Sequence, residues 1–347
     1  MIFSRNYKLI LCMLFTAFST GSYAQLGGAY TYGFLGLTSA ARSAALSGNV
    51  VAANDPNLSM VYENPALLDS TMGNQVSLSY VNYFADINYG QAAYAMNTSR
   101  LGTFSARIFY LNYGNFIEAN EYGEITGSFK AAEYNLGISW GLQLDSAFTV
   151  GLSIKPVYSV FERYSSWGIA GDVALLYRSQ ENRFSAGLVA RNIGTQLTTY
   201  DNPIREPIPF EILAGLNYKI KHAPFSLFLN LNHLEKYDLD VVLPGDITDP
   251  ATGEKVYNSR FQETALKTLD HVGLGAEFVP GKAINIRFGY NFRRRSELKL
   301  GTKNTASGMS FGLGLKLKNF NLDYSLASYH VSGVSHLLTI TADLDNL

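Results

Sequence analysis

Cysteine is almost absent from this sequence of 347 residues, since Cys12 is the only one. Charged residues are scarce as well, at 16% of the chain, against roughly 25% in soluble domains. The net charge of -1 gives no reason to expect a nucleic-acid partner. No apolar run is long enough for a membrane helix. These shortages argue against a disulfide scaffold, a cysteine enzyme and a helical membrane protein.

The N-terminus has the pattern of a secretory signal. Arg5 and Lys8 precede a short apolar run, and Ser22-Tyr23-Ala24 supplies small residues at the two positions that signal peptidase reads. We therefore predict a signal peptide over residues 1–24. Its removal would take away Cys12 and leave a mature chain without cysteine.

Histidine gives little support for metal binding or catalysis. The five histidines are scattered, and none has the spacing of a helical zinc motif. A metal could use His330 and His336, which flank a short link, but solvated loop ends are the simpler interpretation. A hydrolase would need a serine, a histidine and an orienting Asn or Asp, and no motif joins such residues here. We expect a protein that is not an enzyme and that holds no cofactor.

What the chain does contain is strict alternation of apolar and polar residues, clearest between Ala283 and Tyr329. Three successive runs there place aliphatic and aromatic side chains on one face and Arg, Lys, Asp, Asn and Gly on the other. Each run is about twice the usual strand length and close to that of a tilted strand crossing a bilayer. We predict an all-β transmembrane barrel with lipid outside and a wet lumen inside.

The same alternation predicts about 14 antiparallel strands between residues 75 and 347. They are expected at Gln75–Ala85, Asn88–Asn97, Thr103–Phe116, Ser128–Gln143, Ala147–Glu162, Ser166–Arg178, Asn182–Asn192, Pro209–Ile220, Phe225–Lys236, Leu269–Val279, Ala283–Arg295, Ala306–Lys318, Asn319–Tyr329 and His336–Asn346.

The predicted links are short after even-numbered strands. Every long link follows an odd-numbered strand: Ile117–Gly127, Ile193–Ile208, Tyr237–Thr268 and Ser296–Thr305. Outer-membrane barrels have short turns in the periplasm and longer loops outside. We therefore predict an outer-membrane protein with both termini in the periplasm.

The free energy of placing charged side chains in lipid predicts which face of each strand points outward. A slip of Ala283–Arg295 by one residue would put Arg287 and Arg293 into lipid, at roughly 2–4 kcal/mol each near the midplane. The assigned facing predicts that Leu313→Arg blocks insertion and that Gly312→Ser is tolerated. Pro156 lies inside a predicted strand, where it removes a ladder donor and suggests a bulge or kink.

Residues 25–74 do not alternate. They contain small residues, turn residues and one short predicted helix, Ala40–Leu46, before the tripeptide Asn64-Pro65-Ala66. We predict that this segment is a plug inside or under the barrel, because side chains alone do not fill a wide barrel. A surface arm is the alternative.

Two outer features are candidate contact surfaces. The Tyr237–Thr268 loop carries Asp246, Asp249, Glu254 and Tyr257 and is a candidate partner-binding loop, with a simple shielding loop as the alternative. Arg293, Arg294 and Arg295 form a candidate basic rim for anionic lipopolysaccharide, unless they are merely solvated. In the lumen, residues such as Arg287, Glu277 and Asp323 line a permeation path or form a charge ladder that stiffens the wall.

The chain resembles known barrels at two levels. Asn64-Pro65-Ala66, preceded by a small-residue helix and an Asn-Asp turn, is similar to the plug region of the FadL-type superfamily. A closer resemblance, to the PorQ family of the type IX secretion system of Bacteroidetes, is carried by Phe34–Asn49, Tyr62–Leu68, Asn112–Phe129, Lys155–Asp172, Ala190–Leu197, Arg205–Leu216 and Phe288–Leu298.

The closer resemblance implies a non-catalytic part of a cell-surface attachment machinery. Its implied partners are a PorZ-like surface protein, the sortase-like PorU and the related barrel PorV, in a system that joins cargo to anionic lipopolysaccharide. The alternative function is a FadL-like transporter of hydrophobic small molecules. A transporter would need an apolar pocket at the plug, near Phe34, Leu35 and Leu37, and a lateral opening near Pro156.

Overall fold

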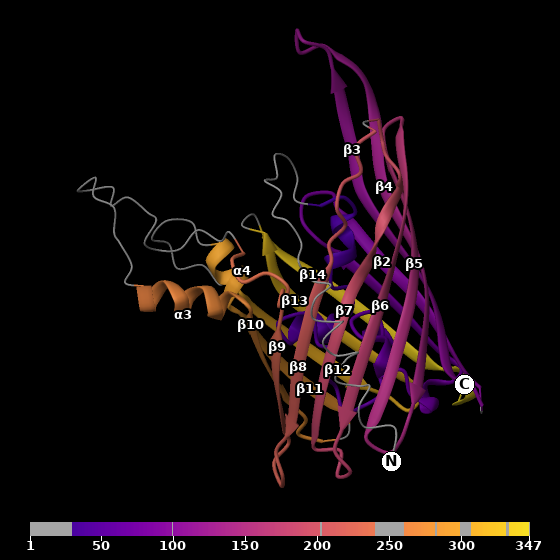
Figure 1. Cartoon of the computed structure of the whole chain (residues 1–347), viewed down its shortest axis with the longest axis vertical. Helices are drawn as coiled ribbons and strands as arrows, with labels where there is room; N and C mark the ends of the chain where they lie inside the picture. Colours follow the sequence, from indigo (N-terminus) through magenta and orange to yellow (C-terminus); the bar gives the residue numbers. More distant parts are fainter. Residues whose placement is uncertain are drawn as a thin grey trace, which may run out of the picture.

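The computed structural model describes residues 30–98, 100–201, 203–239, 260–281, 283–298, 307–330 and 333–346. These residues form a closed barrel of 14 antiparallel strands (Figure 1). Each strand pairs with its neighbours in sequence, and β1 closes the barrel by pairing with β14. The prediction of a barrel of 14 antiparallel strands with an N-terminal plug is confirmed.

The strands agree with the predicted positions to within a few residues at most boundaries. They are β1 (Gln75–Asn82), β2 (Asn88–Thr98), β3 (Gly102–Ala119), β4 (Ile125–Gln143), β5 (Phe148–Phe161), β6 (Tyr164–Arg178), β7 (Phe184–Thr198), β8 (Glu211–Lys219), β9 (Phe225–Leu231), β10 (Val272–Phe278), β11 (Ile284–Asn291), β12 (Met309–Lys316), β13 (Phe320–His330) and β14 (Gly333–Asp343).

The predicted facing is confirmed on the strands that suggested it. On β11 and β12, Phe288 and Leu313 are exposed on the outer face, whereas Arg287 and Gly312 are buried on the lumen face. Arg287 pairs with Gly312 across the two strands. One expectation is wrong, however: Gly312→Ser cannot be accommodated freely, because a β-carbon there would lie 2.5 Å from the β-carbon of Ala45 in the plug.

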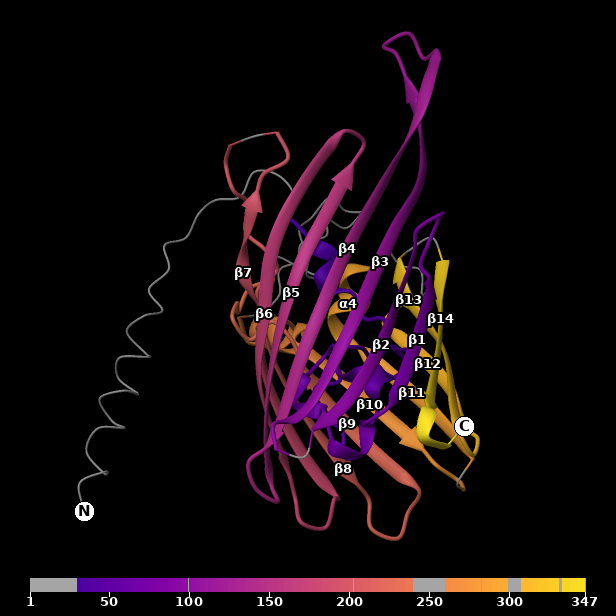
Figure 2. The same cartoon turned by 90° about the vertical axis from the view of Figure 1, so that its right-hand side faces the viewer.

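The barrel wall is much taller on one side than on the other. β3 and β4 have 18 and 19 residues, whereas β8, β9, β10, β11 and β12 have 7 to 9. The β3–β4 hairpin therefore projects far beyond the rest of the barrel (Figures 1 and 2). Its link is shorter than predicted, because the strands continue to Ala119 and resume at Ile125.

The two ends of the barrel differ in their links. One end, here the short-turn end, carries links of three to five residues, such as 144–147 and 179–183. The other, the long-loop end, carries the β3–β4 hairpin and the helices α3 (Arg260–Asp270) and α4 (Phe292–Glu297). These helices correct two predictions: β11 ends at Asn291, so Arg293 does not belong to it, and β10 begins only at Val272.

Residues 30–74 are the plug and lie inside the barrel (Figure 2). The plug is a chain of short elements: η1 (Gly33–Gly36), α2 (Ala41–Ala45), η2 (Leu58–Met60), η3 (Pro65–Leu67) and η4 (Ser70–Met72). Most of its side chains are buried against the wall. The predicted signal peptide, residues 1–24, lies outside the described residues.

No helix in the described part of the chain is long and apolar enough to cross a membrane.

Candidate functional site

The candidate site is the lumen, where the plug meets the wall through glycines. A β-carbon at Gly151 of β5 would lie 2.2 Å from the nitrogen of Ala66, and one at Gly187 of β7 would lie 2.2 Å from the carbonyl oxygen of Val51. Real β-carbons do not come this close to another heavy atom. Glycine is therefore needed on the lumen face because plug backbone and wall backbone are in direct contact.

Asn64-Pro65-Ala66 is the point at which the plug is seated on β5. The Oδ1 atom of Asn64 accepts from the nitrogen of Ala66 at 2.7 Å and begins the turn η3. Its Nδ2 atom donates to the carbonyl oxygen of Val51 at 2.7 Å. Asn64 is fully buried, so these bonds satisfy both ends of an amide that would otherwise be costly to bury. The tripeptide thus fixes the plug to its own chain and to the wall.

A first group of charges, all buried except Asp55, joins the plug to β10, β11 and β13. Arg42 of α2 pairs with Asp55 of the plug at 2.6 Å and with Glu277 of β10 at 2.8 Å. Glu277 in turn pairs with Arg287 of β11 at 2.7 Å, and Arg287 pairs with Asp323 of β13. This is the arrangement expected of a charge ladder, and it ties the plug to three wall strands.

A second group lies further round the barrel, at β7 and β8. Arg191 of β7 has no exposed surface and pairs with Glu63 of the plug at 3.1 Å and with Glu211 of β8. It also donates to the Oδ1 atom of Asn49 at 3.3 Å. A buried guanidinium held by two carboxylates is favourable only while both partners remain. Arg191 therefore couples the position of the plug to the integrity of the β7–β8 wall.

The third group surrounds Tyr62 on the tall side of the barrel. The guanidinium of Arg107 lies 3.8 Å from the centre of the Tyr62 ring, and the Tyr62 hydroxyl donates to the carbonyl oxygen of Leu35 at 2.5 Å. Nearby, Lys155 of β5 pairs with Asp172 of β6 at 2.7 Å. The plug is thus held on three sides by buried polar contacts, which sequence reasoning missed because the partners are distant along the chain.

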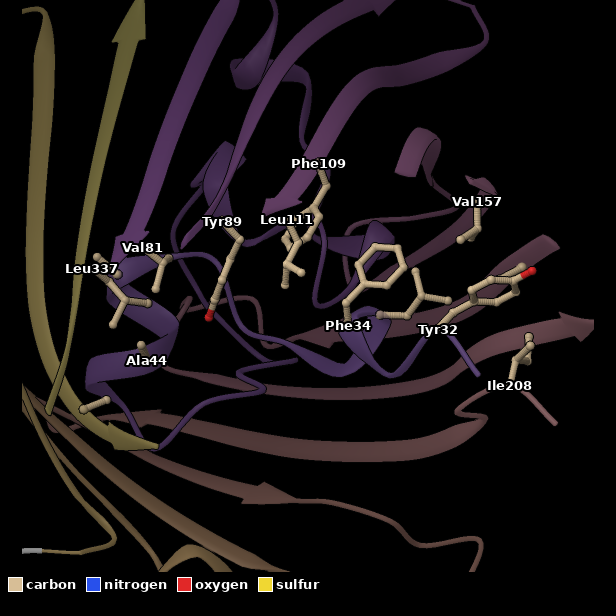
Figure 3. Close-up of a cluster of buried hydrophobic side chains, with 14 residues drawn as sticks. Tyr32, Phe34, Ala44, Val81, Tyr89, Phe109, Leu111, Val157, Ile208 and Leu337 are labelled. Atoms are coloured by element: carbon tan, nitrogen blue, oxygen red, sulfur yellow. The ribbon is translucent and has the colours of Figure 1, made fainter. Parts of the chain in front are cut away.

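The apolar part of the plug is filled rather than hollow. Phe34 and Leu35 are buried in a cluster with Tyr89 and Phe109, and the ring of Phe109 lies 5.6 Å from both Phe34 and Tyr89 (Figure 3). Neither Phe34 nor Leu35 lines the two cavities described next. Of the three residues at which a transporter pocket was predicted, Phe34 and Leu35 are therefore packed in this cluster, whereas Leu37 lines the second of these cavities.

A cavity of about 680 Å³ opens at the short-turn end. It lies under the plug and reaches Asp55, Glu277 and Asp323, which are already engaged in ion pairs. The rest of its lining combines asparagines with apolar residues: Asn54, Asn57, Asn182, Asn217, Asn285 and Asn321, and Phe228, Val279 and Leu315. The lining is therefore mixed and does not by itself select water over an apolar molecule.

A second cavity, of about 360 Å³, lies at the long-loop end between the plug and α4. Leu37, Tyr83, Phe210, Arg294 and Tyr329 are among its walls. Asp270, the last residue of α3, also faces it, and burial raises the pKa of that carboxyl above its usual value. This cavity therefore combines aromatic rings with charges of both signs.

The structure describes only some of the predicted contact residues. Asp246, Asp249, Glu254 and Tyr257 lie outside the described residues, so the partner-binding loop stays a prediction. The three arginines of the predicted basic rim are not simply solvated. Arg293 pairs with Glu297 at 2.6 Å, Arg294 turns into the outer cavity, and Arg295 donates to Ser307 at 3.1 Å. Contact with lipopolysaccharide is not tested by this arrangement.

Pro156 lies beside an interruption in the wall. The β4–β5 ladder pairs Asn135 with Val157 and Ile138 with Ile154, but the two positions between them are not paired in these described strands. The Nδ2 atom of Asn135 donates instead to the carbonyl oxygen of Pro156 at 2.9 Å. On its other side Pro156 pairs normally with Ile169. The register is the same on both sides of Pro156, so the predicted bulge is not found in β4–β5; the irregularity is confined to two positions at which the ladder is interrupted.

No sequence-family profile matches the chain, and no curated protein matches it at a significant level. Among solved structures, the fold is similar to the toluene transporter TbuX of Ralstonia pickettii, with a TM-score of 0.54 and 13% identity over 90% of this chain and 100% of that one. It is also similar to the toluene transporter TodX of Pseudomonas putida, with a TM-score of 0.53 and 14% identity over 88% of this chain and 97% of that one. The monoaromatic hydrocarbon channel CymD gives a TM-score of 0.52 and 14% identity over 90% of this chain and 99% of that one.

At these identities the similarity shows the fold alone, which this chain shares with the solved transporters and channel. The broad resemblance to FadL-type barrels is consistent with this shared fold. The closer resemblance, to the PorQ family, stays a prediction.

Proposed function

We propose that this protein is a non-catalytic outer-membrane barrel that holds a protein partner at the cell surface, as an accessory of a type IX secretion and attachment complex. The observation that carries the proposal is the β3–β4 hairpin. A strand of roughly 9–11 residues crosses a bilayer, whereas β3 and β4 have 18 and 19. With the short-turn end in the periplasm, the upper part of the hairpin stands outside the membrane.

The tip of this hairpin has the chemistry of a contact surface. Ile117, Tyr122 and Ile125 are 71%, 83% and 72% exposed. Below them, the rings of Phe116 and Phe129 stack at 5.0 Å. Large apolar side chains gathered on a part of the protein that reaches into water mark an interaction site.

The seated plug also favours docking over transport. The plug is held by buried ion pairs at Arg42 and Arg191 and by glycine contacts on several strands. A permeant molecule would have to displace these contacts, whereas a docking barrel has no need to. The closed lumen suits a protein whose task lies at its outer surface.

The identity of the partner rests on the resemblance to the PorQ family. It implies a PorZ-like surface protein, together with PorU and PorV. The loop Tyr237–Thr268, with Asp246, Asp249, Glu254 and Tyr257, remains a second candidate contact for the same partner, and Arg293, Arg294 and Arg295 remain candidates for lipopolysaccharide.

The test is affinity capture of the tagged barrel from gently solubilised outer membranes. The hairpin variant carries Ile117→Ser, Tyr122→Ser and Ile125→Ser. Its matched control carries Leu101→Ser, Leu144→Ser and Leu317→Ser, which change three exposed apolar residues at the short-turn end. We expect a stoichiometric surface protein to co-purify with the native barrel and the control but not with the hairpin variant. Equal recovery with all three would refute the docking site.

A second candidate function is a channel for small apolar molecules, and the similarity to solved toluene and monoaromatic channels favours it. The gap between β4 and β5 at Pro156 would be its lateral exit. The unbroken register places Leu136 opposite Pro156, and both are exposed, so we expect Leu136→Cys/Pro156→Cys to form a disulfide that joins β4 to β5 there. Vesicles containing this variant should take up labelled toluene when reduced and not when oxidised. Uptake no faster than in empty vesicles would exclude the channel.

A further inference from the structure

The cavity at the long-loop end contains a buried hydrogen-bond donor, the Nη1 atom of Arg294, that has no acceptor among the described residues. Beside it lies the buried hydroxyl of Tyr329, whose polar side-chain neighbours are Thr38 and Arg294. Both belong to one stacked pair, in which the guanidinium of Arg294 lies 4.2 Å from the centre of the Tyr329 ring. A buried guanidinium nitrogen without an acceptor is costly, and it indicates a missing group that accepts hydrogen bonds.

The local structure at the start of α4 directs the Arg294 side chain into the cavity. The Oδ1 atom of Asn291 accepts from the backbone nitrogen of Arg294 at 2.9 Å and begins α4, which turns the side chain inward. The Nη2 atom reaches the carbonyl oxygen of Ser47 at 3.4 Å, a long contact. Its neighbour Arg293 has a carboxylate partner, Glu297. Among the described residues, Arg294 has no such carboxylate.

The surroundings narrow the chemistry of the missing group. A guanidinium presents a planar pair of donors that matches a carboxylate. The carboxylates of Glu211, Asp270 and Glu297 line the same cavity and disfavour a second negative charge on the ligand. Two of them are already paired, Glu211 with Arg191 and Glu297 with Arg293. Aromatic rings form other parts of the wall: Tyr83, whose ring lies 5.5 Å from that of Tyr329, and Phe210. A volume of about 360 Å³ is at the small end of ligand sites.

We propose that this cavity binds a small aromatic carboxylate, with Arg294 and Tyr329 donating hydrogen bonds to the carboxylate and the aromatic walls packing on the ring. The site is distinct from the docking hairpin, and its ligand would be an anion rather than a hydrocarbon.

The test uses the full mature chain in detergent micelles and ligand-observed NMR, with benzoate as the probe and benzyl alcohol as its neutral counterpart. We expect benzoate to bind at least tenfold more tightly than benzyl alcohol. Arg294→Gln should weaken benzoate binding about tenfold and abolish the preference for the acid. Arg163→Gln is the matched control, because Arg163 is an exposed cation that does not line the cavity.

A milder variant, Tyr329→Phe, removes only the hydroxyl and should weaken benzoate binding about threefold. It keeps the proposal testable if Arg294→Gln does not fold, which heat-modifiable migration on a gel would reveal. Equal binding of benzoate and benzyl alcohol, or unchanged benzoate binding in both variants, would overturn the proposal. If sulfate or acetate occupied the site as tightly as benzoate does, the proposal that the site selects an aromatic ring would be wrong. Partner capture by the hairpin should be unaffected, which separates this site from the docking function.

Discussion

Ala45 of the plug and Gly312 of β12 are in such close contact that a β-carbon on residue 312 would lie 2.5 Å from the β-carbon of Ala45. The lumen face of β12 therefore packs directly against α2, in addition to presenting polar side chains to the lumen. Several consequences of this seating can be measured.

Gly312→Ser should loosen the plug without abolishing the barrel. The new side chain forces α2 away from the wall, and overpacking of this kind costs about 1–3 kcal/mol. The heat-modifiable transition should move to lower temperature, and protease should reach the plug. Gly281→Ser is the matched control, because no atom lies within 4 Å of a β-carbon at Gly281. A normal transition temperature in Gly312→Ser would show that the plug adjusts at no cost.

Leu313→Arg should prevent stable insertion. Leu313 is 54% exposed on the outer face of β12, where lipid is expected, and a cation there costs roughly 2–4 kcal/mol near the midplane. Leu313→Ala keeps the position apolar and should insert normally. The measurement is the fraction of folded barrel recovered in outer membranes. Similar recovery of both variants would mean that the outward facing of β12 has been misassigned.

Arg191→Met should be among the most destabilising substitutions in the lumen. It leaves Glu63 and Glu211 buried without their cation, and loss of one partner from a buried ion pair costs about 3–5 kcal/mol. Adding Glu63→Gln and Glu211→Gln to Arg191→Met should recover much of this loss. Urea unfolding in micelles measures both effects. If the triple variant is no more stable than Arg191→Met, the uncompensated charges are not the cause.

Deleting residues 30–74 should turn the closed barrel into a pore. The plug fills the lumen, and the wall that it leaves behind is polar, with Glu277, Arg287 and Asp323 among its side chains. Single-channel recording in planar bilayers should show stable conductance for the deletion and none for the intact chain. Steady conductance by the intact chain would instead mean that the plug leaves a water path open.

The strands were predictable because each carries its own signal. Ile286, Arg287 and Phe288 alternate in the sequence as they do in the wall, since one face meets lipid and the other meets the lumen. The ends of strands were less predictable. Asn291 ends β11 by accepting from the nitrogen of Arg294, a local bond that alternation does not reveal.

The sequence by itself determined that this is a 14-stranded barrel with an N-terminal plug, because alternation, link length and the loss of alternation before residue 75 are all local properties of the chain. Only the tertiary structure decided how the plug is held. Arg42 and Glu277, and Arg191 and Glu63, are far apart along the chain and meet only when the barrel closes around residues 30–74. The same closure turned Arg294 from a predicted rim residue into the wall of a cavity, because the side chains that surround it come from strands and plug elements that the sequence cannot place together.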